Sequence, residues 1–138
     1  MKFEGYLEKQ SGEKYWAVVM PMFGVFTQGK TKKEAYFMAK DAIEFLVDKK
    51  GFEVQISEGP ANRFYISANK ISPLIGLLLK QKRLERGLTI IEIANRLGSK
   101  SPTAYSRYES GKVQPSFEKL DEILKAMGDD LEPIIRVG

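Results

Sequence analysis

The stretch that decides the fold is SPTAYSRYESGKVQP, Ser101 to Pro115, which mixes small hydroxyl side chains with aromatic and basic ones. Ser101 is suited to cap a helix that has Pro102 at its first position and runs to about Tyr108, because both residue types favour a helix start. Tyr105 and Tyr108 lie three residues apart and are expected to face the core. Either this stretch only completes a small core, or it contacts something outside the protein.

Two helices are expected before this stretch. The first spans Pro73 to about Arg86, although Gly76 inside it should cost about 1 kcal/mol relative to Ala. The second begins at a capping box formed by Thr89 and Glu92, whose side chains satisfy free N–H groups of the first turn, and it ends at Gly98. The expected buried residues are Leu74, Leu77, Leu78 and Leu84 in the first helix and Ile93, Ala94 and Leu97 in the second.

One helix and a tail are expected after it. Ser116 caps this helix and Gly128 ends it. Its apolar stripe consists of Phe117, Leu120, Ile123, Leu124 and Met127. The tail LEPIIRV, residues 131–137, could form a short strand that pairs with another copy of itself.

The first half of the chain has the periodicity of strands. Short segments rich in Tyr, Phe, Val and Ile and bounded by turn residues are EGYLEKQ (4–10), KYWAVVMP (14–21), GVFTQG (24–29), FEVQIS (52–57) and RFYISA (63–68). Between the third and the fourth, Thr31 and Glu34 form a second capping box, which opens a helix that Gly51 closes. The apolar residues that fall at helical spacing in it are Ala35, Met38, Ala39, Ala42, Leu46 and Val47.

These patterns predict an α+β fold with a boundary near Ser72. Residues 1–72 are expected to form a small sheet covered by one helix, and residues 73–138 an all-α domain of four to five helices with a short tail. Pro73 marks the boundary because it disfavours helical conformation at the preceding residue and fits the first turn of a new helix.

Composition restricts the available chemistry. The 138 residues include neither Cys nor His, which removes the commonest bases, nucleophiles and metal ligands. We expect no metal and no cofactor, and a hydrophobic core that no disulfide supports. No apolar run is long enough to span a membrane, and the first ten residues lack the apolar region of a secretion signal. A cytoplasmic protein without a membrane partner is therefore expected.

Positive charge is concentrated around the segment Ser101 to Pro115. The chain as a whole has a formal charge of +4, but residues 80–112 hold eight basic residues against three acidic ones, and residues 113–138 hold three basic against six acidic ones. A basic block suits a surface that faces phosphates, because neutralising phosphates releases condensed counterions. A solvated charged face explains the charge equally well.

Two short helices joined by a tight turn that contains glycine have the proportions of a helix-turn-helix unit, whose second helix presents its N-terminal residues to base edges in the major groove. Small hydroxyl residues can approach the groove floor, Ala104 could touch a thymine methyl group, and Arg107 could bond guanine or phosphate. The candidate DNA-binding residues are Thr89, Lys100, Ser101, Thr103, Ala104, Ser106, Arg107 and Lys112.

The segment from Leu84 to Leu124 resembles the helix-turn-helix of the Cro/C1 repressor class. The residues that carry the resemblance are Gly87, Leu88 and Thr89 at the entry; Ala94, Leu97 and Gly98 in the first short helix; and Ser106, Arg107, Tyr108, Glu109, Gly111, Lys112 and Pro115 at the exit. Two departures from the class are Ile90, where a phosphate-contacting Gln is common, and a turn that is one residue longer than usual. The resemblance implies binding to operator DNA.

Residues 15–47 resemble the N-terminal domain of HicB-type antitoxins, a degenerate ribonuclease-H-like layer. The matching residues are Pro21, Gly24, Thr27, Gly29, Thr31, Glu34 and Ala35, while Met22 and Phe23 depart from the family's usual turn. This resemblance implies that the first domain binds and neutralises a small HicA-type toxin that cleaves RNA. It also implies that the second domain represses the shared operon, and that the protein forms dimers or larger homo-oligomers.

The residues themselves bear on two other functions. Metal-dependent catalysis needs converging carboxylates, and no strand of the first half carries a pair at suitable spacing, so we expect no enzyme. A stand-alone repressor whose first domain dimerises or senses a small molecule remains the alternative. One aromatic cluster of the first half is expected to form core, or otherwise a protein-binding patch or a ligand pocket; it consists of Tyr15, Trp16, Phe23, Phe26, Tyr36 and Phe37.

Overall fold

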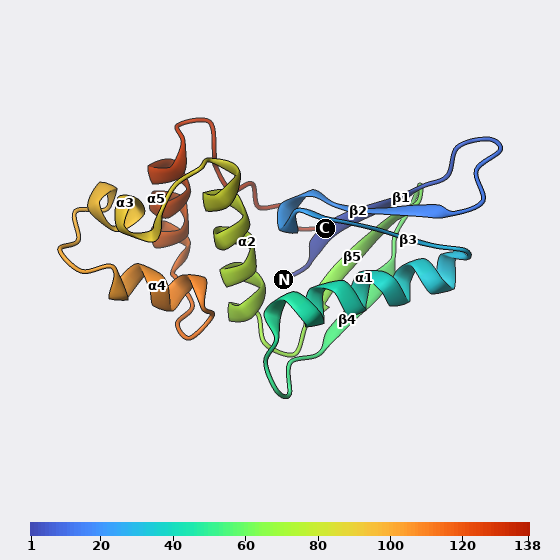
Figure 1. Cartoon of the computed structure of the whole chain (residues 1–138), viewed down its shortest axis with the longest axis horizontal. Coiled ribbons are helices and arrows are strands. Elements are labelled where there is room, and N and C mark those ends of the chain that lie inside the picture. Colours follow the sequence, from blue (N-terminus) through green and yellow to red (C-terminus); the bar gives the residue numbers. More distant parts are fainter. The chain divides into compact units, whose positions relative to one another are not determined.

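A computed structural model describes all 138 residues of the chain. The chain divides into two compact units, Met1–Ile71 and Ser72–Gly138. The first unit combines a sheet with one helix, and the second consists of helices and an extended tail (Figure 1). The expected mixed α+β architecture is therefore confirmed.

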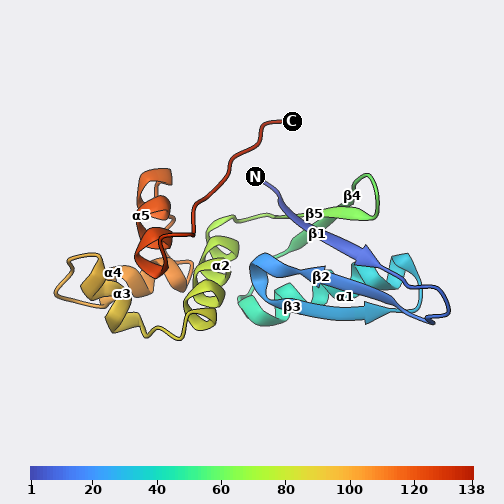
Figure 2. The ribbon, with the colours of Figure 1, turned by 90° about the horizontal axis from the view of Figure 1, so that it is seen from above.

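A five-stranded antiparallel sheet forms the first unit, with the strands in the order β3-β2-β1-β5-β4. The strands are β1 (Phe3–Glu8), β2 (Trp16–Met20), β3 (Val25–Gly29), β4 (Val54–Glu58) and β5 (Arg63–Ala68). A single turn of 3-10 helix, η1 (Pro21–Phe23), connects β2 to β3. Helix α1 (Lys32–Val47) lies along one face of this sheet, as Figures 1 and 2 show from two directions.

The sheet has one buried face and one open face. Along β1, Phe3, Gly5 and Leu7 are buried while Tyr6 and Glu8 are exposed, as expected for a strand that is covered on one side. The buried face packs on α1 through Ala35, Ala39 and Ile43. The core of this unit consists of Phe3, Leu7, Val18, Met20, Phe23, Ala35, Ala39, Ile43, Phe52, Val54, Phe64 and Ile66.

Helix α1 begins where β3 ends, and this junction requires a glycine. A Cβ atom on Gly29 would overlap the backbone nitrogen of Ala35, so any larger residue would force the strand away from the helix. The hydroxyl of Thr31 accepts a hydrogen bond from the Glu34 N–H group at 3.1 Å. The reciprocal bond of the expected capping box is not formed, so only half of that prediction is correct.

The end of α1 differs from the prediction. The helix ends at Val47, and Asp48 adopts the left-handed conformation, with φ of 48°. An aspartate tolerates this conformation because its short polar side chain bonds locally. Gly51, the predicted end, also has positive φ but lies in the following turn, so the helix is shorter than expected.

The prediction that the aromatic residues of the first half form core is largely wrong. Of the six aromatic residues named in that prediction, only Phe23 is fully buried, and its ring packs edge-to-face on Phe3 with the ring centres 5.4 Å apart. Phe26 is 71 % exposed on the open sheet face, and Phe37 is 63 % exposed on α1. Alternation in a strand and periodicity in a helix put these two side chains on the faces that nothing covers.

The second unit contains four helices around one core. They are α2 (Ser72–Glu85), α3 (Ile90–Arg96), α4 (Thr103–Glu109) and α5 (Phe117–Met127). The buried apolar residues are Leu74, Ile75, Leu78, Leu79, Ile93, Ala94, Tyr105, Ile123, Leu124 and Met127. Two residues of the expected stripes, Leu84 and Phe117, are exposed, and each lies at a helix end.

Helices α2 and α4 lie in close contact at Gly76. A Cβ atom there would lie 2.5 Å from the backbone oxygen of Glu109 and 2.9 Å from that of Tyr108. The glycine weakens α2 as an isolated helix, and its benefit is the close approach of α4.

The tail after α5 forms neither helix nor strand in the single chain. Gly128 ends α5, and the Leu131 N–H group bonds back to its carbonyl at 3.0 Å. The residues beyond it are extended, and most of them are exposed. The expected pairing with another copy is a property of two chains, which this single chain does not test.

Candidate DNA-binding surface

Hydrogen bonds define both ends of helix α3, which a short turn joins to helix α4. At the start of α3 the Thr89 hydroxyl accepts from the Glu92 N–H group at 3.1 Å, and the Glu92 carboxylate accepts from the Thr89 N–H group at 3.2 Å. This complete capping box confirms the prediction for α3. At the other end Gly98 has φ of 75°, and the Ser99 N–H group bonds to the Ala94 carbonyl.

The start of α4 lies one residue later than predicted. The helix begins at Thr103 and follows Pro102, which has helical backbone angles and offers no capping side chain. Ser101 still contributes, because its hydroxyl accepts from the Thr103 N–H group at 3.3 Å. Ser99 donates its hydroxyl proton to the Ser101 carbonyl at 2.8 Å, which fixes the turn in front of the helix.

Helix α4 has one exposed side and one buried side. With about 3.6 residues per turn, Thr103, Ala104 and Arg107 fall on the same side of the helix, and all three are exposed. Tyr105 lies on the opposite side and is buried, as predicted. Ser106, which is half-buried, lies at the edge of the exposed side.

Two lysines flank this exposed side. Lys100 is exposed in the turn before α4, and Lys112 is exposed in the turn after it, where its N–H group bonds to the Arg107 carbonyl at 3.0 Å. Neither lysine forms an ion pair, and the same is true of Arg107. The structure thus gathers Lys100, Ser101, Thr103, Ala104, Ser106, Arg107 and Lys112 on or beside α4, a set that we call the α4 surface. Thr89 lies outside it, at the start of α3, with its hydroxyl engaged in the cap.

A buried ion pair holds α4 on α2. Arg83 donates from Nε and Nη2 to the Glu109 carboxylate, with a shortest distance of 2.6 Å, and from Nη1 to the Leu88 carbonyl at 2.8 Å. The Arg83 pKa is raised mainly by its hydrogen bonds to Glu109, so the guanidinium stays charged. The three groups tie α2, the entry to α3 and the end of α4 together.

Several cations of the basic block between residues 80 and 112 are held by contacts within the protein. Arg83 is buried and engaged, and Lys82 forms an ion pair with Glu85 at 3.1 Å. Arg96 donates to the Ala126 carbonyl at 2.9 Å. Several cations between residues 80 and 112 therefore serve the fold, and the count from sequence overstates the charge available to DNA.

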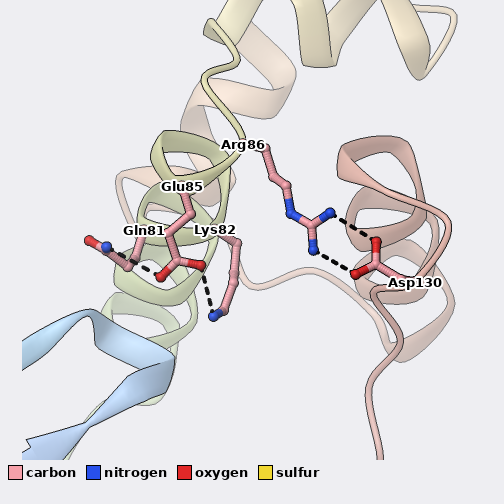
Figure 3. Close-up of polar contacts among 5 residues, drawn as sticks. All are labelled: Gln81, Lys82, Glu85, Arg86 and Asp130. Atoms are coloured by element: carbon pink, nitrogen blue, oxygen red, sulfur yellow. Dashed lines mark hydrogen bonds and ion pairs between the residues drawn. The ribbon is translucent and has the colours of Figure 1, made fainter.

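Arg86 also serves the fold. It binds the Asp130 carboxylate through both terminal nitrogens, at 2.8 and 2.9 Å, and so connects the end of α2 to the segment after α5 (Figure 3). The hydrogen bonds from Arg86 lower the pKa of Asp130 below its usual value near 3.8. Figure 3 also shows Glu85 accepting from Gln81 and Lys82 within α2.

Tyr105 anchors the buried side of α4. Its ring is buried, and its hydroxyl has no hydrogen-bond partner that satisfies ordinary geometry. Burial, followed by the neighbouring Glu109 carboxylate, raises the pKa of this hydroxyl, so it stays protonated. The side chain therefore serves to position the helix.

No three acidic side chains gather into a group that could hold a metal ion. Every helix is too short or too polar for a membrane span.

Comparison with known proteins gives a match within the second unit. Residues 79–132 match the helix-turn-helix family. A proposed HTH-type transcriptional regulatory protein of Aeropyrum pernix is 39 % identical over 57 residues, which make up 41 % of this chain and 17 % of that protein. The helix-turn-helix resemblance seen in the sequence is thereby confirmed for this part of the chain, with α3 and α4 as its two short helices.

Sequence patterns did not reveal the Arg83–Glu109 ion pair, which holds α4 on α2. Arg83 and Glu109 are 26 residues apart and belong to different helices, so no local spacing connects them. The available signal was indirect: a charged residue, Arg83, continues the buried side of α2 two turns after Gly76 and one turn after Leu79. Charged residues at such positions are rarely buried unless they are paired.

Proposed function

We propose that the protein regulates transcription by binding operator DNA through the α4 surface. The observation that carries this proposal is the side of α4 that bears Thr103, Ala104 and Arg107, which are all exposed and flanked by two lysines without ion pairs. The helix-turn-helix match supports it. In this arrangement the start of α4 enters the major groove, and short side chains let its backbone approach the bases.

The proposal assigns different tasks to the residues of the α4 surface. Arg107 has five N–H donors and reaches either a guanine edge or a phosphate, while Thr103 and Ala104 contact base edges. Lys100 and Lys112 bind phosphates on the two sides of the groove and fix the position of the helix without reading sequence. Thr89 would bind a phosphate only by donating its hydroxyl proton, since its backbone N–H group is already donated to the Glu92 carboxylate in the α3 cap.

The test is to select DNA sequences that the full chain binds and to compare variants on the selected site. Arg107→Ala should weaken specific binding by about 1–3 kcal/mol if Arg107 reads a base. Lys33→Ala, which removes a charge of the same sign from the exposed side of the first unit, serves as the control and should bind as wild type does. Equal affinity of wild type and Arg107→Ala would refute the assignment.

The second part of the proposal is that the first unit, with a degenerate ribonuclease-H-like HicB layer, neutralises a small HicA-type toxin. The observation that favours a protein partner is a pair of exposed phenylalanines on α1. Phe37 is 63 % and Phe45 is 80 % exposed, two turns apart on the side opposite to Ala35, Ala39 and Ile43. Exposed apolar groups of this kind mark interaction surfaces. A repressor without a toxin fits the helix-turn-helix domain equally well and is the alternative.

Two growth assays in one host separate these functions: expression of the neighbouring small open reading frame alone, and together with this chain. Relief of toxicity on co-expression supports the antitoxin. Phe45→Ser should then reduce relief, whereas Leu84→Ser, at an exposed apolar position in the second unit, should not. A harmless neighbour, or toxicity that persists while this protein is abundant, leaves the stand-alone repressor.

A further inference from the structure

The tail carries apolar side chains that nothing in the chain covers. Ile134 is 88 %, Ile135 64 % and Val137 93 % exposed, and these are β-branched residues that favour strands. A single chain leaves them in water at a cost in free energy that association would remove.

We propose that residues 131–137 pair in antiparallel fashion with the same residues of a second copy, so that a two-stranded ribbon joins two helix-turn-helix units. Oligomeric state reports on this proposal without DNA, so it stands or falls separately from the proposed function.

The sequence of the tail is complementary to itself in one antiparallel register. With Ile134 opposite Ile134 of the second copy, Glu132 lies opposite Arg136 on both sides of the centre. The same register sets Leu131 opposite Val137, which pairs two apolar side chains. Cross-strand pairs of opposite charge stabilise a sheet, and the parallel alternative would set Glu132 beside Glu132 and Arg136 beside Arg136. Charge therefore selects the antiparallel arrangement.

Pro133 is compatible with this register. It has no N–H group to donate, so it fits a two-stranded ladder only where the N–H group would point away from the partner. If the two Ile134 residues exchange both of their backbone bonds, Glu132 and Arg136 occupy the next bonded pair, and Pro133 falls at a non-bonded position. No hydrogen bond of the ladder is lost.

Strand alternation divides the tail into two sides. Leu131, Pro133, Ile135 and Val137 are all apolar and fall on one side of the strand, while Glu132, Ile134 and Arg136 fall on the other. Leu131 and Pro133 are half-buried already in the single chain. Pairing would therefore mainly cover Ile134, Ile135 and Val137.

Two copies related by this ribbon have twofold symmetry, because the register is symmetric about Ile134. Paired α4 surfaces would then meet a DNA site with two inverted halves.

The experiment measures the mass of the full chain in solution over a range of concentrations by light scattering and sedimentation. Ile134→Lys should halve the mass at a given concentration, because it sets two lysines opposite each other at the centre. Phe117→Lys, also at an exposed apolar position of the second unit, is the control and should leave the mass unchanged.

Charge reversal provides the sharper test. Glu132→Arg and Arg136→Glu should each weaken self-association by about tenfold or more, because each change creates two pairs of like charges. The double variant E132R/R136E restores both opposite-charge pairs and should restore the wild-type mass. The proposal would be overturned if Ile134→Lys had the same mass as wild type, or if the double variant did not restore self-association. A wild-type chain that is monomeric at every concentration would overturn it as well.

Discussion

Replacing Arg83 by Met should destabilise the second unit strongly. The side chain donates three hydrogen bonds to Glu109 and one to the Leu88 carbonyl. Methionine fills much of the same space but donates nothing, so the change leaves a carboxylate that is only 7 % exposed without its cation.

The size of the effect follows from this burial. Removing one partner of a buried ion pair costs about 3–5 kcal/mol, because the remaining charge is desolvated and unpaired. Domains of this size are stable by only about 5–15 kcal/mol, so the variant should lose a large part of its stability. Replacing both partners, as Arg83→Met with Glu109→Leu, should recover most of the loss, since no buried charge remains.

The chain offers separate probes for its two units. Trp16 is the only tryptophan and lies in β2, so its fluorescence follows the first unit. Four of the five helices belong to the second unit, so circular dichroism at the helical band follows mainly that unit. In urea, Arg83→Met should shift the dichroism transition and leave the Trp16 transition in place. A wild-type transition for the single variant, or a double variant less stable than either single one, would refute the reasoning.

Further predictions concern the same unit. Gly76→Ala should lower the free energy of unfolding of the second unit, because overpacking against the Glu109 backbone costs about 1–3 kcal/mol and outweighs the gain of about 1 kcal/mol in helix propensity. A variant that is more stable in urea would contradict the close contact between Gly76 and that backbone. Asp130→Asn should destabilise at neutral pH. Because Arg86 lowers the pKa of Asp130, the stabilisation by the Arg86–Asp130 ion pair is fully present above the unfolded pKa near 3.8. It is lost as the pH falls through the lower pKa of the folded state. The difference in thermal unfolding between wild type and variant should therefore shrink at acid pH. Tyr105→Phe should leave stability equal or higher, since the buried hydroxyl lacks a partner; a loss above about 1 kcal/mol in urea would reveal a hydrogen bond to Glu109.

Local signals were sufficient to predict most elements of the fold. The cap at Thr89 and the burial of Tyr105 depend on residues within a few positions, and both are confirmed. The end of α1 was misplaced because Asp48 and Gly51 can both adopt the left-handed conformation, and propensity favours the glycine. The exposure of Phe26 and Phe37 was missed because an aromatic residue signals burial on average, whereas which face of a sheet is covered depends on tertiary structure.

The candidate site shows the same division between local and long-range information. Thr103, Ala104 and Arg107 could be named as candidates from the sequence, and helical periodicity is enough to put them on one side of α4. Which cations remain available to a ligand could not be predicted, because the partners of Arg83 and Arg86 lie 26 and 44 residues away.

This difference in available cations has a measurable consequence for DNA binding. The logarithm of the binding constant falls with the logarithm of salt concentration by about 0.9 for each phosphate that a protein cation neutralises. If all eight basic residues between 80 and 112 faced phosphate, each bound chain would contribute a slope of about −7. The α4 surface supplies three cations, Lys100, Arg107 and Lys112, and so a slope of about −3 per chain. Titrations on one selected DNA site at several salt concentrations distinguish these values, and Lys112→Ala should reduce the slope by about 1. A slope near −7 per chain would mean that cations outside α4 also bind phosphate, and that the surface is wider than α4 and its flanking turns.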